Sequence, residues 1–146
     1  MIQISPHMRI LLAVAPIDFR VGIDGLVALC RQRLEADPFS GGVFVFSNRR
    51  RSSIKILMYD GSGYWLCQKR LSSGHLAYWP DGAGPASTLE ACELQVLLMG
   101  GDPTQANVPA PWRRLPVAAS RAPTPQRTPA VASRTSAEPH APAAGA

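Results

Sequence analysis

Apolar and polar positions follow two periodicities along the chain, one typical of helices and one typical of strands. The apolar run from Ile10 to Val14 is typical of a buried strand, and Pro16 ends it. Apolar residues then recur every three or four positions, which predicts an amphipathic helix that ends before Asp37-Pro38. The apolar stripe of this helix consists of Ile23, Leu26, Val27, Cys30 and Leu34.

Three strands are predicted next, over residues 43–47, 53–59 and 64–71, because turn signals separate them. Symmetric pairing about the turns at 48–51 and 60–63 sorts the side chains onto two faces. The face predicted to be core carries Val43, Val45, Ile54, Ile56, Met58, Trp65 and Cys67. The other carries Phe44, Phe46, Lys55, Leu57, Tyr59, Tyr64, Leu66, Gln68 and Arg70.

The following segment predicts a short edge strand over 75–79 and a Gly/Pro-rich loop over 81–86. Ser87 and Glu90 have the spacing of a capping box, so a last helix is predicted to begin there and to stop at Gly100-Gly101. Its core face is predicted to hold Leu89, Cys92, Val96 and Met99. The fold class is therefore α+β, with a small antiparallel sheet in the order β-α-β-β-β-α packed with two helices.

Composition divides the chain into a domain over 1–102 and a tail over 103–146. The tail holds nine of the fourteen prolines, many alanines and a single aromatic residue, Trp112. Such a stretch buries too little apolar area to offset the entropy of ordering its backbone, so we expect a disordered Pro/Ala/Arg-rich tail. The first 102 residues carry ten Lys or Arg against nine Asp or Glu, whereas the tail has a net charge of +4. The basic pI is therefore weak evidence that the domain binds nucleic acid.

The three cysteines, Cys30, Cys67 and Cys92, are far apart and each lies among apolar residues. We expect three buried thiols in a reducing cytoplasm, without a metal site or another cofactor. The longest apolar run is far too short to span a bilayer, so no membrane partner is expected.

Several motifs occur in an order that resembles a known family. They are DFRVGIDGL (18–26), DPFSG (37–41) with VFVF (43–46), the arginine turn with IKIL (54–57), DGSG (60–63) before WL (65–66), and KRL (69–71). Together they resemble the TnpB accessory protein, the product of the second open reading frame (Orf2) of insertion-sequence family sixty-six transposons. The chain departs from the family pattern at Ser72-Ser73-Gly74 and at 100–103, where Gly-Gly-Asp-Pro replaces Gly-Ile-Asp-Trp.

The resemblance implies an accessory role in DNA transposition beside a separate transposase that carries the DNA-cutting carboxylates. The expected partners are the transposase, other proteins of the same element and transposon-end DNA. A metal-dependent nuclease is the alternative, since it needs two or three carboxylates that converge on divalent metals. The acidic residues have simpler structural roles: Asp18 precedes a helix, Asp60 lies in a turn and Glu90 fits a capping box. We therefore expect no catalytic residues.

Basic residues supply the candidate DNA contacts. Three successive arginines on a hairpin tip could reach phosphate oxygens, and the predicted face with Phe44, Tyr59 and Tyr64 mixes aromatic with basic side chains. The alternative is that the tip is merely polar and the aromatics pack under a helix. A purely protein-binding adaptor is also open, as is a partnered Asp18–Arg20 pair that holds the loop before the first helix. The candidate DNA-binding residues are Arg49, Arg50, Arg51, Lys55, Lys69 and Arg70.

Overall fold

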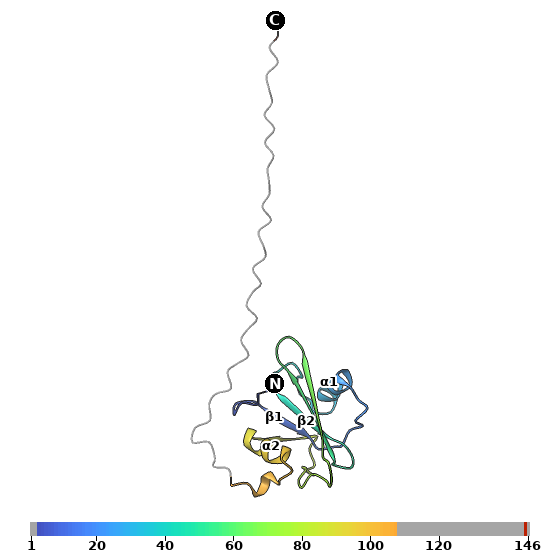
Figure 1. Ribbon diagram of the computed structural model, residues 1–146. Helices are drawn as coiled ribbons and strands as arrows, with labels where there is room; N and C mark the ends of the chain where they lie inside the picture. Colours follow the sequence, from blue (N-terminus) through green and yellow to red (C-terminus); the bar gives the residue numbers. More distant parts are fainter. Residues whose placement is uncertain (1–2, 108–144, 146) are drawn as a thin grey trace.

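The computed structural model describes residues 3–107 and 145 of the 146 residues. The predicted tail therefore lies almost entirely outside the described residues. The described part of the chain contains two helices and five strands (Figure 1). In chain order the elements are β1 (Ile10–Ala13), α1 (Ile23–Gln32), β2 (Val43–Ser47), β3 (Ser53–Tyr59), β4 (Tyr64–Arg70), β5 (Ala86–Leu89), α2 (Ala91–Leu98) and the 3-10 turn η1 (Pro103–Gln105).

The five strands form one sheet in the order β4-β3-β2-β1-β5. Every neighbouring pair is antiparallel except β1 and β2, which run parallel because α1 connects them as a crossover. The predicted α+β class is confirmed, with one parallel pair in a sheet predicted to be antiparallel. Figure 1 shows α1 and α2 on opposite sides of the sheet, so the domain has three layers.

Each face of the sheet carries its own core. Alternation along β1 and β2 sends Leu12 and Val45 to the α2 side and Leu11 and Phe44 to the α1 side. Both strands are buried along their whole length, as is typical of central strands covered on both faces. This explains why Ile10 to Val14 reads as a continuous apolar run rather than an alternating one.

The two hairpins have the predicted register. Val45 lies opposite Ile56, which lies opposite Cys67, and Phe44 lies opposite Leu57, so the predicted division into two faces is confirmed. The prediction that Trp65 and Cys67 are core was wrong. Both are exposed because β4 is the edge strand and α2 does not cover it.

The segment after β4 was assigned wrongly. Residues 75–79 form no strand; instead Leu76 and Trp79 insert into the core on the α2 side. The fifth strand is Ala86–Leu89, which pairs with the free edge of β1 and so satisfies backbone groups that would otherwise stay unpaired. The capping-box spacing from Ser87 to Glu90 therefore did not mark a helix start.

The second helix begins at Ala91, one turn later than predicted, with Glu90 as its N-cap. The Glu90 N–H donates to the Glu93 carboxylate over 2.7 Å. The predicted core face was also wrong: Leu94 and Leu97 are fully buried, whereas Met99 is 85% exposed. Leu94 lies two residues after Cys92, which places it on nearly the opposite side of the helix, because each residue turns a helix by about 100°.

Only Cys30 of the three cysteines is buried; Cys67 and Cys92 are exposed, which corrects the expectation of three buried thiols. Burial raises the pKa of the Cys30 thiol to about 12. At the altered family motif, Asp102 caps η1 by accepting from the Thr104 N–H at 2.9 Å, and Pro103 is buried. Within the described residues no helix is both long and apolar enough to cross a membrane.

Candidate functional site

The turn between β2 and β3 presents three consecutive exposed arginines, Arg49, Arg50 and Arg51. Asn48 holds the backbone of this turn. Its Oδ1 accepts from the N–H groups of Ser52 and Ser53 at 2.9 and 3.2 Å, and its Nδ2 donates to Ser52 Oγ at 3.0 Å. Arg51 has a left-handed backbone (φ 53°) and donates its N–H to the Asn48 carbonyl. We call residues 48–52 the arginine turn.

Residues 75–76 also hold the arginine turn in place through hydrogen bonds to its backbone. The Leu76 N–H donates to the Arg51 carbonyl at 2.8 Å, and His75 Nδ1 lies 2.7 Å from the Arg50 carbonyl oxygen. Because Leu76 is itself buried, this contact anchors the turn to the core. The backbone of the arginine turn is thus bonded from both sides while its three guanidinium groups face solvent. Such a turn presents cations at low entropic cost.

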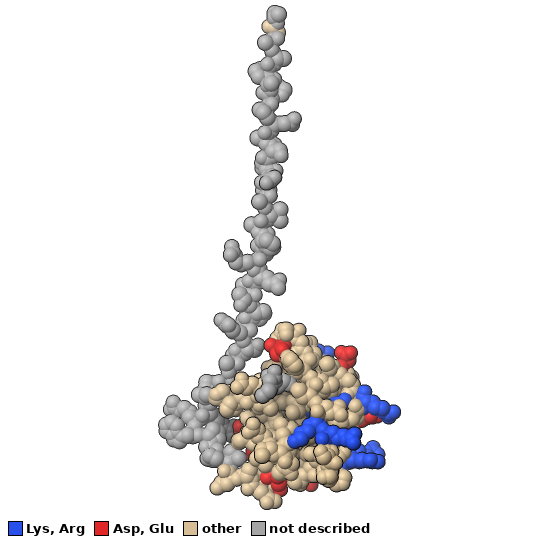
Figure 2. Space-filling view, in the orientation of Figure 1, with Lys and Arg blue, Asp and Glu red and all other residues tan. Residues whose placement is uncertain are grey.

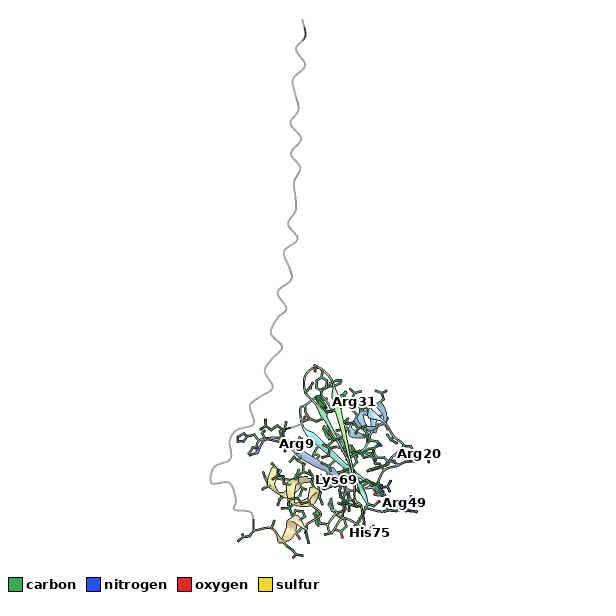
Figure 3. All side chains as sticks on the ribbon, viewed as in Figure 1. Arg9, Arg20, Arg31, Arg49, Lys69 and His75 are labelled. Carbon is green, nitrogen blue, oxygen red and sulfur yellow. The ribbon has the colours of Figure 1, made fainter. Side chains whose placement is uncertain are left out.

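The remaining basic residues divide into two groups. Arg70 lies opposite Ser53 at the end of β4, next to the arginine turn, and is exposed. Lys69 is also exposed, but its ammonium donates to the Leu98 carbonyl at the C-terminal end of α2. Figure 3 places Arg20, Arg49 and His75 on one side of the domain, and Figure 2 shows Lys and Arg side chains gathered there.

Lys55 is not part of this basic surface. Lys55 is only 5% exposed, and its Nζ donates to the Phe19 and Val21 carbonyl oxygens at 2.8 and 2.7 Å. The ammonium also lies 5.2 Å from the centre of the Phe19 ring. Its role is to attach the loop before α1 to the sheet, and it is not free to contact a phosphate. The burial of Lys55 could not be predicted from its position on the strand, because side-chain alternation does not show which loop packs over a strand.

The aromatic side chains of the same face pack within the domain and are not free to stack on bases. Phe44 and Phe46 are buried under α1, and Tyr59 and Tyr64 pack against Phe39 with ring centres 4.9 and 5.5 Å away. The hypothesis of a base-stacking sheet face was therefore wrong for Phe44 and Phe46. The alternative, that these rings pack under a helix, is what the structure shows.

Sequence reasoning placed Asp18 and Arg20 together as a pair, and the structure confirms it. Arg20 Nη2 and Asp18 Oδ2 lie 2.8 Å apart, and the guanidinium contacts both carboxylate oxygens. The side-chain hydrogen bonds from Arg20 lower the pKa of Asp18 from its ordinary 3.8 to about 2. Asp18 thereby neutralises Arg20, which Figure 3 shows on the same side of the domain as Arg49.

We expect an NMR titration of the Asp18 carboxyl to give a pKa about 2, and the Arg20→Gln variant to restore it towards 3.8. The folded pKa lies below the unfolded one, so the pair stabilises the fold at pH above about 4 and loses this effect as the pH falls through 2. The Arg31→Gln variant is the control, with an unchanged Asp18 pKa. A carboxyl that titrates normally in the wild-type protein would contradict the pairing.

The acidic residues are dispersed, and several have structural partners. Asp60 closes the turn before β4: it accepts from Ser62, from Gly63 and, at 2.7 Å, from Trp65 Nε1. These hydrogen bonds, led by that from the Ser62 N–H, hold the Asp60 pKa well below its usual range. In the part of the chain that the structure describes, no three His, Cys, Asp or Glu side chains gather in a metal-binding group.

An apolar groove of about 310 Å³ opens beside α1. Leu29 and Leu34 form one wall, Ile17 and Phe46 another, and the Arg33 side chain lines the groove as its one charged residue. Sequence reasoning missed this groove. It lies where the end of α1 meets the loop after β1 and the residue Pro85, segments that are distant in the chain.

Fold and surface together define a small α+β protein with a hydrogen-bonded arginine turn and an apolar groove at the end of α1. Residues 8–108 match the family model described as IS66 Orf2 like protein, and the chain belongs to this family. Its role is that of an accessory protein associated with transposition, as the sequence motifs indicated.

Two relatives are proteins of Sinorhizobium fredii. Uncharacterized protein y4jC is 40% identical over 105 residues, which cover 72% of this chain and 89% of that protein. Uncharacterized protein y4hO is 32% identical over 102 residues, which cover 70% of this chain and 88% of that protein. No solved structure matches the chain.

Proposed function

We propose that this chain is a non-catalytic accessory protein that binds transposon-end DNA through the arginine turn and so helps to position a separate transposase. The observation that carries the proposal is the construction of the turn. Three exposed arginines stand on a backbone that Asn48 and the 75–76 segment hold in place. Guanidinium groups pair well with phosphate oxygens, and a preorganised turn loses little entropy when it binds.

Local charge supports the proposal. No acidic residue occurs between Asp37 and Asp60, so the hairpin that carries the arginine turn is uniformly basic. Arg70 adds a further exposed cation at the adjoining end of β4. Phosphate contacts of this kind position a protein on a duplex but do not read its sequence.

The Arg49→Ala/Arg50→Ala variant is expected to bind a labelled duplex of the transposon's terminal repeat about 10- to 100-fold more weakly than wild type at low salt. Its log–log salt slope should fall by about 1.8, which corresponds to two lost phosphate contacts. Fluorescence anisotropy over a salt series measures both quantities. The full chain is used, so that residues 103–146 contribute equally to every variant.

The Arg9→Ala/Arg31→Ala variant is the matched control, because it loses the same charge away from the arginine turn. Arg9 adjoins the opposite end of β2, where its carbonyl accepts from Val43, and Arg31 lies over the Phe39 ring. Equal losses in both variants would show that binding responds to net charge alone and would contradict the assignment to the turn.

A protein-binding adaptor is the second candidate function, and the apolar groove favours it. Ala15, Leu29 and Pro85 offer aliphatic contacts at its surface, and Arg33 suits an apolar segment of the transposase that has an adjoining acidic residue. The two candidates separate in a transposition assay. The DNA-positioning function requires that reversal of charge at Arg49 and Arg50 lowers transposition, whereas a pure adaptor tolerates that change.

A further inference from the structure

Strand β4 forms an open edge of the sheet. It is the outermost strand on its side, is seven residues long and contains neither proline nor glycine, and five of its residues are exposed. The largest of these exposed side chains, Trp65, is 47% exposed. An exposed strand of this length is a template for pairing with another strand.

Hydrogen bonds at the two ends of the β3–β4 hairpin show which backbone groups are free. The Asp60 N–H donates to the Gly63 carbonyl at 3.1 Å, and the Leu71 N–H donates to the Ser52 carbonyl at 2.9 Å. Hydrogen-bonded pairs alternate in an antiparallel ladder, so residues 65, 67 and 69 bond to β3. The N–H and C=O groups of Tyr64, Leu66, Gln68 and Arg70 therefore point outward, and among the described residues no backbone hydrogen bond reaches them.

The side chains along this edge are arranged so that the strand complements itself. One end of β4 carries the Trp65 ring with the Asp60 carboxylate 2.7 Å from its Nε1, and the other end carries Lys69 and Arg70. A parallel neighbour would place like ends together. An antiparallel copy instead brings the cationic end of each strand to the aromatic and acidic end of the other.

We propose that a second copy of this chain binds along β4, antiparallel and centred on Cys67, so that two domains share one continuous sheet. This register uses all seven residues and pairs the outward backbone groups of Leu66 with those of the partner's Gln68. It sets Trp65 against the stem of the partner's Lys69, while the Lys69 ammonium keeps its bond to the Leu98 carbonyl. It also sets Tyr64 against the partner's Arg70, which is a cation–aromatic contact. The dimer does not depend on DNA binding.

The register places the two Cys67 residues in a non-hydrogen-bonded pair, where Cα atoms lie about 4.5 Å apart, within the range for a disulfide. The chain has three cysteines, and Cys30 is buried, so the Cys92→Ser variant leaves Cys67 as its exposed thiol. Mild oxidation of this variant is expected to give a disulfide-linked dimer on a non-reducing gel. The Cys67→Ser variant, which keeps Cys92, should give none.

A shifted thiol tests the register. In Cys67→Ser/Gln68→Cys/Cys92→Ser, the new thiol faces the partner's Leu66 rather than its own copy, and cross-linking should be about tenfold slower or more. Equal rates at positions 67 and 68 would show random collision and overturn the proposal.

Sedimentation equilibrium under reducing conditions measures the dimer dissociation constants of the wild-type chain and its Gln68 variants. The wild-type chain is expected to dimerise, and Gln68→Pro to raise the dimer dissociation constant about tenfold or more, because it removes an outward N–H and no β3 hydrogen bond. Circular dichroism checks its fold, and Gln68→Thr is the matched control, with an unchanged constant. A monomeric wild-type protein, or a folded Gln68→Pro protein that dimerises normally, would overturn the proposal. If Gln68→Pro does not fold, the cross-linking comparison decides.

Discussion

Replacing Lys55 by alanine is expected to lower the free energy of unfolding by about 2–4 kcal/mol. The side chain is 5% exposed, and its ammonium is the hydrogen-bond donor to two carbonyl oxygens of the loop between β1 and α1. Alanine would leave the Phe19 and Val21 carbonyls without this donor and would remove the lysine stem from its packing. Urea denaturation of both proteins measures the difference.

Two further variants separate the causes. Lys55→Met keeps most of the apolar stem and loses only the ammonium, so its loss should be smaller than that of Lys55→Ala. Lys69→Ala, at an exposed lysine of the neighbouring strand, should cost about 1 kcal/mol or less. If Lys55→Met proved as stable as wild type yet bound DNA as weakly as Arg49→Ala/Arg50→Ala, Lys55 would be a DNA contact after all.

The second large effect is expected at Trp79, where substitution by alanine should cost about 3–5 kcal/mol. Trp79 is 4% exposed in the core on the α2 side, and its Nε1 donates to the Ala13 carbonyl at 3.0 Å. Alanine would leave a large cavity beneath the loop that leads to β5. Because the same segment supports the arginine turn through Leu76, a loosened loop should also weaken DNA binding in the proposed function.

Trp79→Phe is the comparison for this prediction. It retains an aromatic ring but loses the donor to Ala13, so we expect a cost of about 1–3 kcal/mol, below that of Trp79→Ala. Urea or thermal denaturation gives both values. Equal stability of wild type and Trp79→Ala would mean that residues 75–80 do not contribute to the core as described.

Much of the hairpin region was predictable from the sequence. The turn signals at 48–51 and 60–63 set the register, and period-two alternation then assigned side chains to faces, as the pairing of Val45 with Ile56 confirms. Local signals sufficed because the paired residues are close in the chain. The arginine turn was predictable for the same reason, since a tip between two strands must be exposed.

Prediction failed where the partner is distant in the chain. Residues 86–89 became a strand because the free edge of β1, more than seventy residues earlier, offered hydrogen bonds that outweighed a local capping-box pattern. Lys55 was predicted to be an exposed cation, but the loop at Phe19–Val21 lies over it and accepts its hydrogen bonds. The groove beside Arg33 and the support of the arginine turn by His75 and Leu76 also depend on contacts between separate segments.

The α+β class, the two hairpins, the exposed arginines and the family were all predictable from the sequence, because each depends on short-range patterns or on motif order. Which cations remain free, which strand lies at each edge and where α2 begins became clear from the folded domain alone. Burial and hydrogen-bond satisfaction are properties of the assembled domain. A lysine or a strand edge takes its role from the segment packed against it, and local sequence does not specify that segment.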